Sequence, residues 1–183
     1  KWLENMVDWN LSRSRYWGTP LPVWATDDGS EIRVIGSVEE LKDEISRANK
    51  LLNINQDAEA LAADLHKPYV DQIVLVSDSG KAMTREPDLI DVWFDSGAMP
   101  YAQLHYPFEN HADKTLHHNF PADFIAEGVD QTRGWFYTLH ALGVMLFDSV
   151  AYKTVVSNGL VLDKNGNKMS KRLGNTINPF DTI

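Results

Sequence analysis

The segment from residue 120 to residue 162 constrains the fold most, because its apolar pattern predicts two strands that flank a helix. The first strand is expected over residues 120–126 and the second over residues 153–157. A short third strand is expected over residues 160–162. A strand, a helix and a strand in this order predict a βαβ unit, in which the two strands run parallel.

The predicted helix begins at Asp130, whose side chain suits an N-cap, and continues to about Phe147. Its apolar residues recur at the spacing that places them on one helix face. They are Trp135, Leu139, Leu142 and Leu146, with Phe136, Gly143 and Val144 widening the same face.

Polar residues follow both predicted strands. Residues 127–131 come after the first strand, and residues 157–159 end the second. Because ligands bind outside the carboxyl ends of the strands in parallel sheets, both segments are expected to border one crevice. The sequence therefore predicts a ligand site at this place.

A basic loop follows the strands, with the sequence Lys168-Met169-Ser170-Lys171-Arg172. The preceding Asn165-Gly166 pair predicts a tight turn, so both lysines are expected on an exposed, mobile loop. Two ammonium groups and a hydroxyl could close over a triphosphate and stabilise the charge on departing pyrophosphate. A solvated basic loop is the alternative, but a specified tetrapeptide is rare by chance, and this one lies just past the predicted βαβ unit.

Residues 25–88 are predicted to form a small polar insertion with two hairpins and two helices. The turns of the hairpins are residues 27–29 and 77–80. Ser37 and Glu40 form a capping box that predicts the start of the first helix. The second helix is expected over residues 58–65, before Pro68.

The composition is that of a globular protein, with 43% hydrophobic and 23% charged residues among 183. No apolar run is long enough to span a membrane, so no membrane partner is expected. The net charge of −9 makes a large nucleic-acid surface unexpected in this chain by itself. Because the first residue is not Met, we expect a piece of a longer protein.

Four segments of the sequence carry a resemblance to one enzyme family. Lys168–Lys171 matches the second signature of class I aminoacyl-tRNA synthetases. Asp91–Gly97 and Glu127–Phe136 look like the isoleucine enzymes rather than their valine or leucine relatives. Residues 9–20 are similar to the segment where that chain returns from its editing domain. Over essentially its whole length, the chain resembles the second half of the catalytic domain of isoleucyl-tRNA synthetases.

The resemblance implies a role for each matching residue. The residues that would bind isoleucine or its adenylate are Glu127, Gly128, Asp130 and Gln131, with Glu127 holding the substrate ammonium group. The walls of the isoleucine side-chain pocket would be Trp93 and Trp135. The residues that would bind ATP are Asn158, Gly159, Lys168, Met169, Ser170 and Lys171, with Lys168 and Lys171 acting in catalysis.

The residues by themselves leave other interpretations open. Glu127 is compatible with an ordinary surface carboxylate, and Asp130 with a helix N-cap, a binding residue or both. A tryptophan on an apolar helix face, such as Trp135, is more often plain core than a pocket wall.

Two departures from the family pattern have consequences. Asn158 stands where relatives often have His, so it can donate a hydrogen bond but carries no charge. The paired Cys knuckles that bind zinc in many relatives have no counterpart, because the chain contains no cysteine. We therefore expect no metal site, and expect the hairpins to be held by packing and turn chemistry.

The first class I signature, His-x-Gly-His, is also missing, so the isolated chain is expected to be inactive.

The sequence thus predicts an α/β fold: part of a Rossmann-like parallel sheet with a small inserted α+β subdomain. Three segments are expected: residues 1–24 returning into the catalytic domain, residues 25–88 as the insertion, and residues 89–183 as the second half of the catalytic domain. The resemblance implies a cytoplasmic ligase that uses ATP with Mg²⁺, binds isoleucine and tRNA(Ile), and needs the remainder of the synthetase chain. A synthetase for valine or another branched amino acid, or a non-catalytic nucleotide-binding module, is the alternative.

Overall fold

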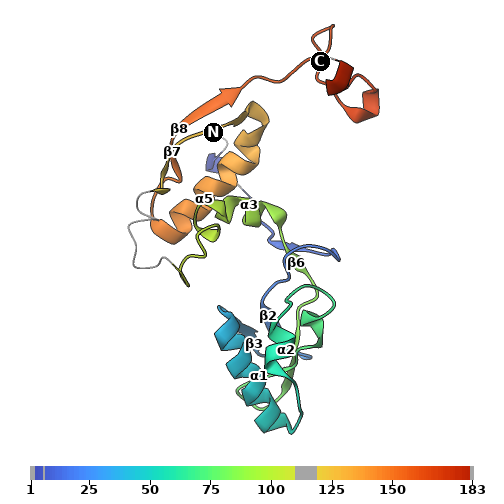
Figure 1. Cartoon of the computed structure of the whole chain (residues 1–183), viewed down its shortest axis with the longest axis vertical. Helices are drawn as coiled ribbons and strands as arrows, with labels where there is room; N and C mark the ends of the chain where they lie inside the picture. Colours follow the sequence, from blue (N-terminus) through green and yellow to red (C-terminus); the bar gives the residue numbers. More distant parts are fainter. Residues whose placement is uncertain (1–2, 6, 110–118, 182–183) are drawn as a thin grey trace. The chain divides into compact units, whose positions relative to one another are not determined.

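The computed structural model describes residues 3–5, 7–109 and 119–181 of the chain. Two compact units, Lys1–Asp95 and Ser96–Ile183, each contain helices and strands (Figure 1). Within the described residues the strands form three small sheets, one of which is a parallel pair. The expected mixture of α and β structure is therefore present. No helix in the described part is both long and apolar enough to cross a membrane.

The first unit contains a four-stranded antiparallel sheet. Its strands are β2 (Val23–Thr26), β3 (Ile32–Val34), β4 (Leu75–Val76) and β5 (Ala82–Arg85), in the order β3-β2-β5-β4. Both predicted hairpins are confirmed, since β2 pairs with β3 and β4 pairs with β5. Gly29 and Gly80 complete the turns at φ values of 65° and 85°, which favour glycine.

The first helix, α1 (Val38–Leu52), begins as predicted after Ser37. Ser37 Oγ accepts a hydrogen bond from the Glu40 N–H at 3.0 Å. The Glu40 carboxylate accepts from the N–H of Gly36 at 2.7 Å, one residue before the cap. The capping box thus satisfies two backbone donors, with its second bond displaced by one residue.

The second helix, α2 (Ala58–Ala62), is shorter than the predicted residues 58–65. Asp64 Oδ1 accepts a hydrogen bond from the His66 N–H at 2.9 Å. This local turn competes with the helical hydrogen bonds, so the helix does not continue. A 3₁₀ turn, η2 (Val70–Gln72), follows before the second hairpin.

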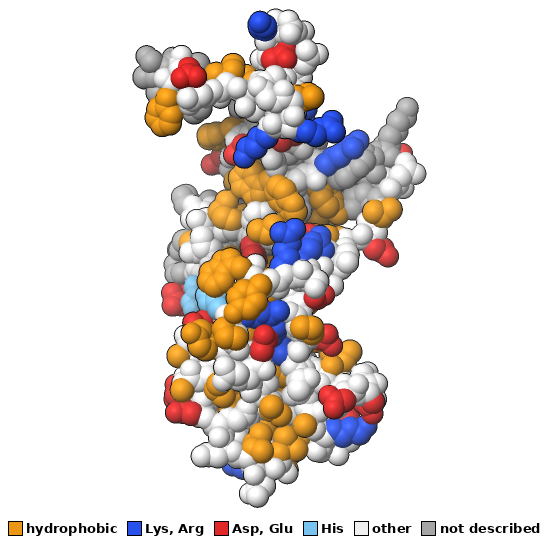
Figure 2. Space-filling model, turned by 90° about the vertical axis from the view of Figure 1, so that its right-hand side faces the viewer, with side chains coloured by type: hydrophobic (Ala, Val, Ile, Leu, Met, Phe, Trp, Pro, Cys, Tyr) orange, Lys and Arg blue, Asp and Glu red, His pale blue; other side chains and the backbone are white. Residues whose placement is uncertain are grey.

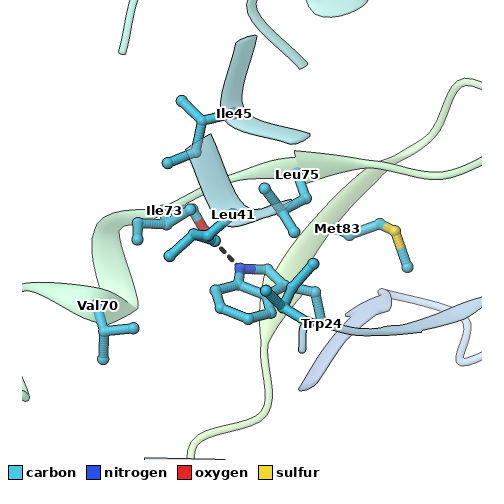
Figure 3. Close-up of a cluster of buried hydrophobic side chains, with 8 residues drawn as sticks. Trp24, Leu41, Ile45, Val70, Ile73, Leu75 and Met83 are labelled. Atoms are coloured by element: carbon cyan, nitrogen blue, oxygen red, sulfur yellow. Dashed lines mark hydrogen bonds between the residues drawn. The ribbon is translucent and has the colours of Figure 1, made fainter. Parts of the chain in front are cut away.

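A hydrophobic core of its own holds this sheet against α1 (Figure 3). Its main side chains are Trp24, Leu41, Ile45, Val70, Ile73, Leu75 and Met83. Trp24 is only 1% exposed, and its indole N–H donates to the Ile73 carbonyl at 3.0 Å. The polar atom of the largest core side chain is therefore satisfied.

The two hairpin turns are joined by ionic and hydrogen bonds. The Lys81 ammonium donates to Asp28 at 2.7 Å, and the pKa of Asp28 lies well below its ordinary value mainly because of this bond. The Glu31 carboxylate accepts from the N–H groups of Asp78 and Ser79 at 3.1 and 3.2 Å.

Among the described residues, no three His, Asp or Glu side chains are grouped so that they could hold a metal ion.

A short antiparallel ribbon joins the segment that precedes the small sheet to the segment that follows it. Its strands are β1 (Ser12–Arg13) and β6 (Leu89–Ile90). The helix α3 (Val92–Ala102) begins one residue after β6, following Asp91, and contains Pro100. The sequence pattern did not predict this helix, although it contains most of the family motif of residues 91–97. A 3₁₀ turn, η1 (Leu3–Asn5), precedes the ribbon.

The second unit contains the predicted βαβ unit. Strands β7 (Ala122–Gly128) and β8 (Tyr152–Asn158) are parallel, and α5 (Trp135–Phe147) connects them. The buried residues of α5 are Phe136, Thr138, Leu139, Leu142 and Gly143. Val144 and Leu146, expected on the same face, are 45% and 58% exposed.

Two details of the prediction for this unit are wrong. Asp130 is not the N-cap of α5, because it lies within a 3₁₀ helix, η3 (Val129–Arg133), and α5 begins after Gly134. Residues 160–162 form no strand, because the chain folds back and Leu162 makes only an isolated antiparallel bridge to Lys168. Two further 3₁₀ turns are η4 (Lys171–Leu173) and η5 (Pro179–Asp181).

The small core yields a matched test within one helix. Leu41 is 2% exposed and Leu51 is 60% exposed, and both lie on α1. We expect Leu41→Ala to lower the free energy of unfolding by about 2–5 kcal/mol, since it removes buried methyl groups and leaves a cavity. Leu51→Ala should change it by less than about 0.5 kcal/mol. Denaturant unfolding measures both, and equal losses would contradict the assigned core.

Candidate functional site

The carboxyl ends of β7 and β8 lie side by side. The parallel register pairs Glu127 with Ser157 and Gly128 with Asn158. Four of the predicted site residues, Glu127, Gly128, Asn158 and Gly159, are therefore brought to one edge of the strand pair. Parallel pairing fixes this, because both strands must end at the same edge.

Two exposed carboxylates stand at this edge. Glu127 and Asp130 are both exposed. A Cβ added at Gly128 would lie 2.4 Å from Asp130 Oδ1, so the carboxylate folds back closely over the glycine. Two negative charges at an open strand end can bind a cation such as an ammonium group.

Gln131 holds the start of α5. Its Oε1 accepts a hydrogen bond from the Trp135 N–H at 2.9 Å, in the place where Asp130 was expected to act. Its amide nitrogen lies 3.5 Å from Asp130 Oδ2 and donates to it. The side chain thus orients the carboxylate and satisfies a free helix donor at the same time.

The two predicted pocket tryptophans have different surroundings. Trp135 is half-buried, and its indole N–H donates to the Ser96 carbonyl at 2.9 Å. Trp93 is 40% exposed. Because the two residues belong to different compact units, their facing across one pocket stays a prediction.

Trp93 lines a pocket of about 540 Å³ in the first unit, beside the β1–β6 ribbon. Asp91, which also lines the pocket, is buried and accepts from Arg13 at 2.7 Å and from the Trp9 indole at 2.9 Å. Asp95 also lines the pocket and accepts from the Thr19 hydroxyl at 3.1 Å. Burial raises the pKa of Asp95, the negative charge of Asp91 raises it further, and the bond from Thr19 lowers it.

The motif of residues 91–97 places a glycine where α3 meets α5. A Cβ added at Gly97 would lie 3.0 Å from the backbone carbon of Thr138 and 3.0 Å from Leu142 Cδ1. A side chain at this position would therefore force its neighbours on the two helices to shift by a few tenths of an ångström. Together with the buried Asp91, this gives both ends of the motif a structural role.

The lysine loop is organised by Asp163, which sequence reasoning missed. Its Oδ1 accepts from the N–H groups of Asn165 and Asn167 at 2.9 and 2.8 Å. Its Oδ2 accepts from the Asn175 amide at 2.9 Å, and these bonds lower the pKa of Asp163, with that from Asn175 the largest cause. The tight turn predicted at Asn165-Gly166 is confirmed, with Gly166 at a φ of 78°.

Asn175 closes the other side of the loop. Its Oδ1 accepts from the Ser170 N–H at 2.9 Å, and its amide donates to the Lys168 carbonyl at 3.3 Å. Ser170 Oγ caps η4 by accepting from the Leu173 N–H at 3.2 Å. Lys171 is thus the first residue of a capped turn, and Met169 is half-buried beside it.

Lys168 and Lys171 are both exposed. Neither has an ion-pair partner within the part of the chain that the structure describes. Within that part, no hydrogen bond joins the loop to residues 127–131. The loop is therefore ordered by its own side chains and presents two uncompensated ammonium groups.

The chain's relationships to known proteins agree with these features. Residues 1–183 match the family model described as tRNA synthetases class I (I, L, M and V). The chain belongs to this family. The isoleucine–tRNA ligase of Cytophaga hutchinsonii is 70% identical over 182 residues, and those of Bacteroides fragilis and Thermus thermophilus are 63% and 54% identical. The motif-based resemblance to isoleucine enzymes is confirmed.

This class I synthetase chain spans only a small part of those relatives. Each match covers 100% of this chain and 16% or 17% of the relative. A similar solved structure is LeuRS from Agrobacterium radiobacter K84 in a ternary complex with tRNA and LeuAMS. It is 18% identical with a TM-score of 0.59, over 94% of this chain and 22% of that one. At this identity the likeness supports the fold of a class I synthetase.

Sequence signals existed for some of the residues that were missed. Asp163 precedes Asn165-Gly166, and a carboxylate before a tight turn commonly accepts backbone N–H groups. Asn175 had no such signal, and neither did the bond from Gln131 to the start of α5, because these partners are set by how the chain folds back.

The close approach at Gly97 can be tested with a second glycine as control. Helix propensity by itself favours Gly97→Ala by about 1 kcal/mol. We expect destabilisation instead, since overpacking costs about 1–3 kcal/mol. Gly159→Ala should be nearly neutral, because nothing lies within 4 Å of its added Cβ. Thermal unfolding of both variants measures this, and a raised melting temperature for Gly97→Ala would contradict the packing.

Proposed function

We propose that this chain supplies part of the active site of an ATP-dependent isoleucine–tRNA ligase. The observation that carries the proposal is 50–70% identity to isoleucine–tRNA ligases across the whole chain. The exposed carboxylates at the strand ends and the free ammonium groups of the lysine loop support it, since they suit a cationic amino group and a polyphosphate.

The proposed reaction has two steps. The isoleucine carboxylate attacks the α-phosphate of ATP, the bond to pyrophosphate breaks, and isoleucyl-adenylate forms. A terminal hydroxyl of tRNA(Ile) then attacks the carbonyl carbon of the adenylate, and AMP leaves. Neither step needs a side-chain nucleophile, so positioning and electrostatic stabilisation carry the catalysis.

On the amino-acid side, Glu127 holds the substrate ammonium group by a charge-assisted hydrogen bond. Asp130 lies within reach because Gly128 has no side chain, and Gln131 keeps it oriented. Trp93 and Trp135 are the proposed walls around the isoleucine side chain. The half-buried position of Trp135 and the partial exposure of Trp93 suit an apolar contact surface.

On the ATP side, Lys168 and Lys171 stabilise the phosphates, with Met169 and Ser170 shaping the loop between them. Asn158 and Gly159 lie at the end of β8, where Asn158 can donate a hydrogen bond to a ribose or phosphate oxygen. Mg²⁺ comes with ATP and neutralises phosphate charge through the phosphate oxygens. Among the described residues, no three His, Asp or Glu side chains are grouped so that the protein could hold the ion without the phosphates.

We further propose that β7 and β8 are two strands of a larger Rossmann-like sheet. Parallel sheets are normally covered on both faces, yet Phe124 is 65% and Val156 is 48% exposed. The exposed Val144 and Leu146 of α5 would also be covered in such a domain. Other segments of a cytoplasmic ligase would then supply the remaining strands and the first signature.

The test is pyrophosphate exchange by the full-length protein with a panel of amino acids. We expect exchange that depends on isoleucine, with valine far weaker, and none from residues 1–183 alone. Preference for valine would establish the related synthetase instead. ATP binding with no amino-acid dependence would show a nucleotide-binding module and overturn the proposal.

Lys171 should act mainly in the transition state, because pyrophosphate charge builds only as the bond breaks. We expect Lys171→Ala in the full-length protein to lower kcat for activation by about ten- to a thousandfold while the isoleucine KM hardly changes. Lys164→Ala is the matched control, since Lys164 is exposed on the same loop before the signature. A raised ATP KM at constant kcat would instead show a ground-state contact.

A further inference from the structure

Two side chains hold the lysine loop together from outside its signature. Asp163 lies before Lys168–Lys171 and Asn175 lies after it, and both are half-buried, whereas the two lysines are exposed. The Asn175 amide donates to Asp163 Oδ2 at 2.9 Å. These two residues are called the loop clasp below. Figure 2 shows Lys and Arg side chains on the surface at the height of the picture where Figure 1 draws the C-terminal residues.

Asp163 closes the half of the loop that precedes the signature. Its Oδ1 accepts from the N–H groups of Asn165 and Asn167 at 2.9 and 2.8 Å, and its own N–H donates to the Asn167 carbonyl at 2.9 Å. The isolated bridge between Leu162 and Lys168 encloses this turn. The carboxylate thus fixes the backbone up to the first lysine.

Asn175 holds the half of the loop that carries the lysines. Its amide donates to the Lys168 carbonyl at 3.3 Å, and its Oδ1 accepts from the Ser170 N–H at 2.9 Å. Lys171 follows Ser170 directly as the first residue of η4. One side-chain amide therefore fixes the backbone of the first lysine and of the residue before the second.

The segments that flank the clasped loop lack bonds of this kind. Residues 160–161 and 176–177 make no hydrogen bond with any residue that the structure describes. A change of backbone direction disturbs the fewest interactions in these two segments. Residues 162–175 are therefore expected to move as one body relative to the strand ends.

We propose that Asp163 and Asn175 are positioning residues for isoleucine activation: they make residues 162–175 one body, which brings Lys168 and Lys171 to the phosphates of ATP in a fixed mutual arrangement. Neither clasp residue touches the substrates. The charge of departing pyrophosphate develops in the transition state, so ammonium groups that are already ordered stabilise it at no further cost. Without the clasp, the lysines keep their charge but lose this arrangement. The inference rests on the proposed function and deepens it by naming residues that act through the lysines.

The experiment exchanges the two clasp side chains in the full-length protein and measures isoleucine-dependent pyrophosphate exchange. Asp163→Asn sets a donor against a donor, and Asn175→Asp sets an acceptor against an acceptor. Each should lower kcat by about ten- to a hundredfold, as for catalytic groups that are slightly misplaced. The isoleucine KM should change by less than about twofold, because the lost stabilisation belongs to the transition state. The double variant restores the bond in the reverse direction and should recover most of the lost kcat.

Asn165→Asp is the matched control, because it adds the same charge to the same loop. The Asn165 side chain makes no hydrogen bond among the described residues, and its backbone N–H still reaches Asp163. The kcat of this variant should stay within about twofold of the wild-type value, as for other exposed substitutions.

Cleavage by trypsin reports on the loop without catalysis. The clasp should protect the peptide bonds after Lys168 and Lys171 in the native protein, since a protease needs a locally opened chain. Both single variants should be cut there faster than the wild type, and the double variant at close to the wild-type rate. The melting temperature should hardly change, because neither clasp residue belongs to the buried hydrophobic core.

The outcomes separate this inference from the function it rests on. If the double variant loses as much kcat as the two single variants combined, the clasp does not position the lysines. The same conclusion follows if kcat and melting temperature fall together, because the residues would then serve the fold alone. Absence of isoleucine-dependent exchange in the wild type overturns the proposed function. In that case, cleavage restored in the double variant still shows that the clasp orders the loop, and unchanged cleavage overturns the clasp too.

Discussion

The first unit depends on the ion pair and the hydrogen bonds that the buried carboxylate of Asp91 makes. It accepts from the Arg13 guanidinium at 2.7 Å, the Trp9 indole at 2.9 Å and the Trp93 N–H at 3.2 Å. Its own N–H donates to the Leu11 carbonyl at 2.7 Å. These bonds close the β1–β6 ribbon and start α3. Removing either charge would leave the other without its partner, which is costly for a buried carboxylate.

A second ion pair, in which only the arginine is buried, fixes the small sheet to its two connections. The Arg85 side chain is fully buried, bonds Asp71 at 2.7 Å through Nε, and donates to the carbonyls of Leu21 and Asp88 at 3.3 and 3.1 Å. The chain thus enters and leaves the small subdomain through segments held by one guanidinium. This subdomain also has its own hydrophobic core around Trp24.

The lysine loop shows how a short motif depends on residues outside it. Lys168 and Lys171 are the residues that a polyphosphate would meet, but Asp163 and Asn175 determine the path of the backbone that carries them. At the strand ends, Gly128 and Gln131 similarly determine where the carboxylate of Asp130 lies. In both places, the side chains proposed to meet a substrate are positioned by neighbouring residues.

Local signals in the sequence were enough to predict both hairpins, the start of α1 at Ser37, the βαβ unit and the turn at Asn165-Gly166. Each of these depends on a period or on a turn residue that acts over a few positions. The helix α3, the capping of α5 by Gln131 and the loop closure by Asn175 were decided only in the tertiary structure. Their partners depend on how the chain folds back: Gly97 is explained by Thr138, and the N–H of Ser170 by a side chain five residues later. The sequence determined by itself which chemical groups are available and the family they belong to, whereas long-range packing decided which of those groups remain free to bind a ligand.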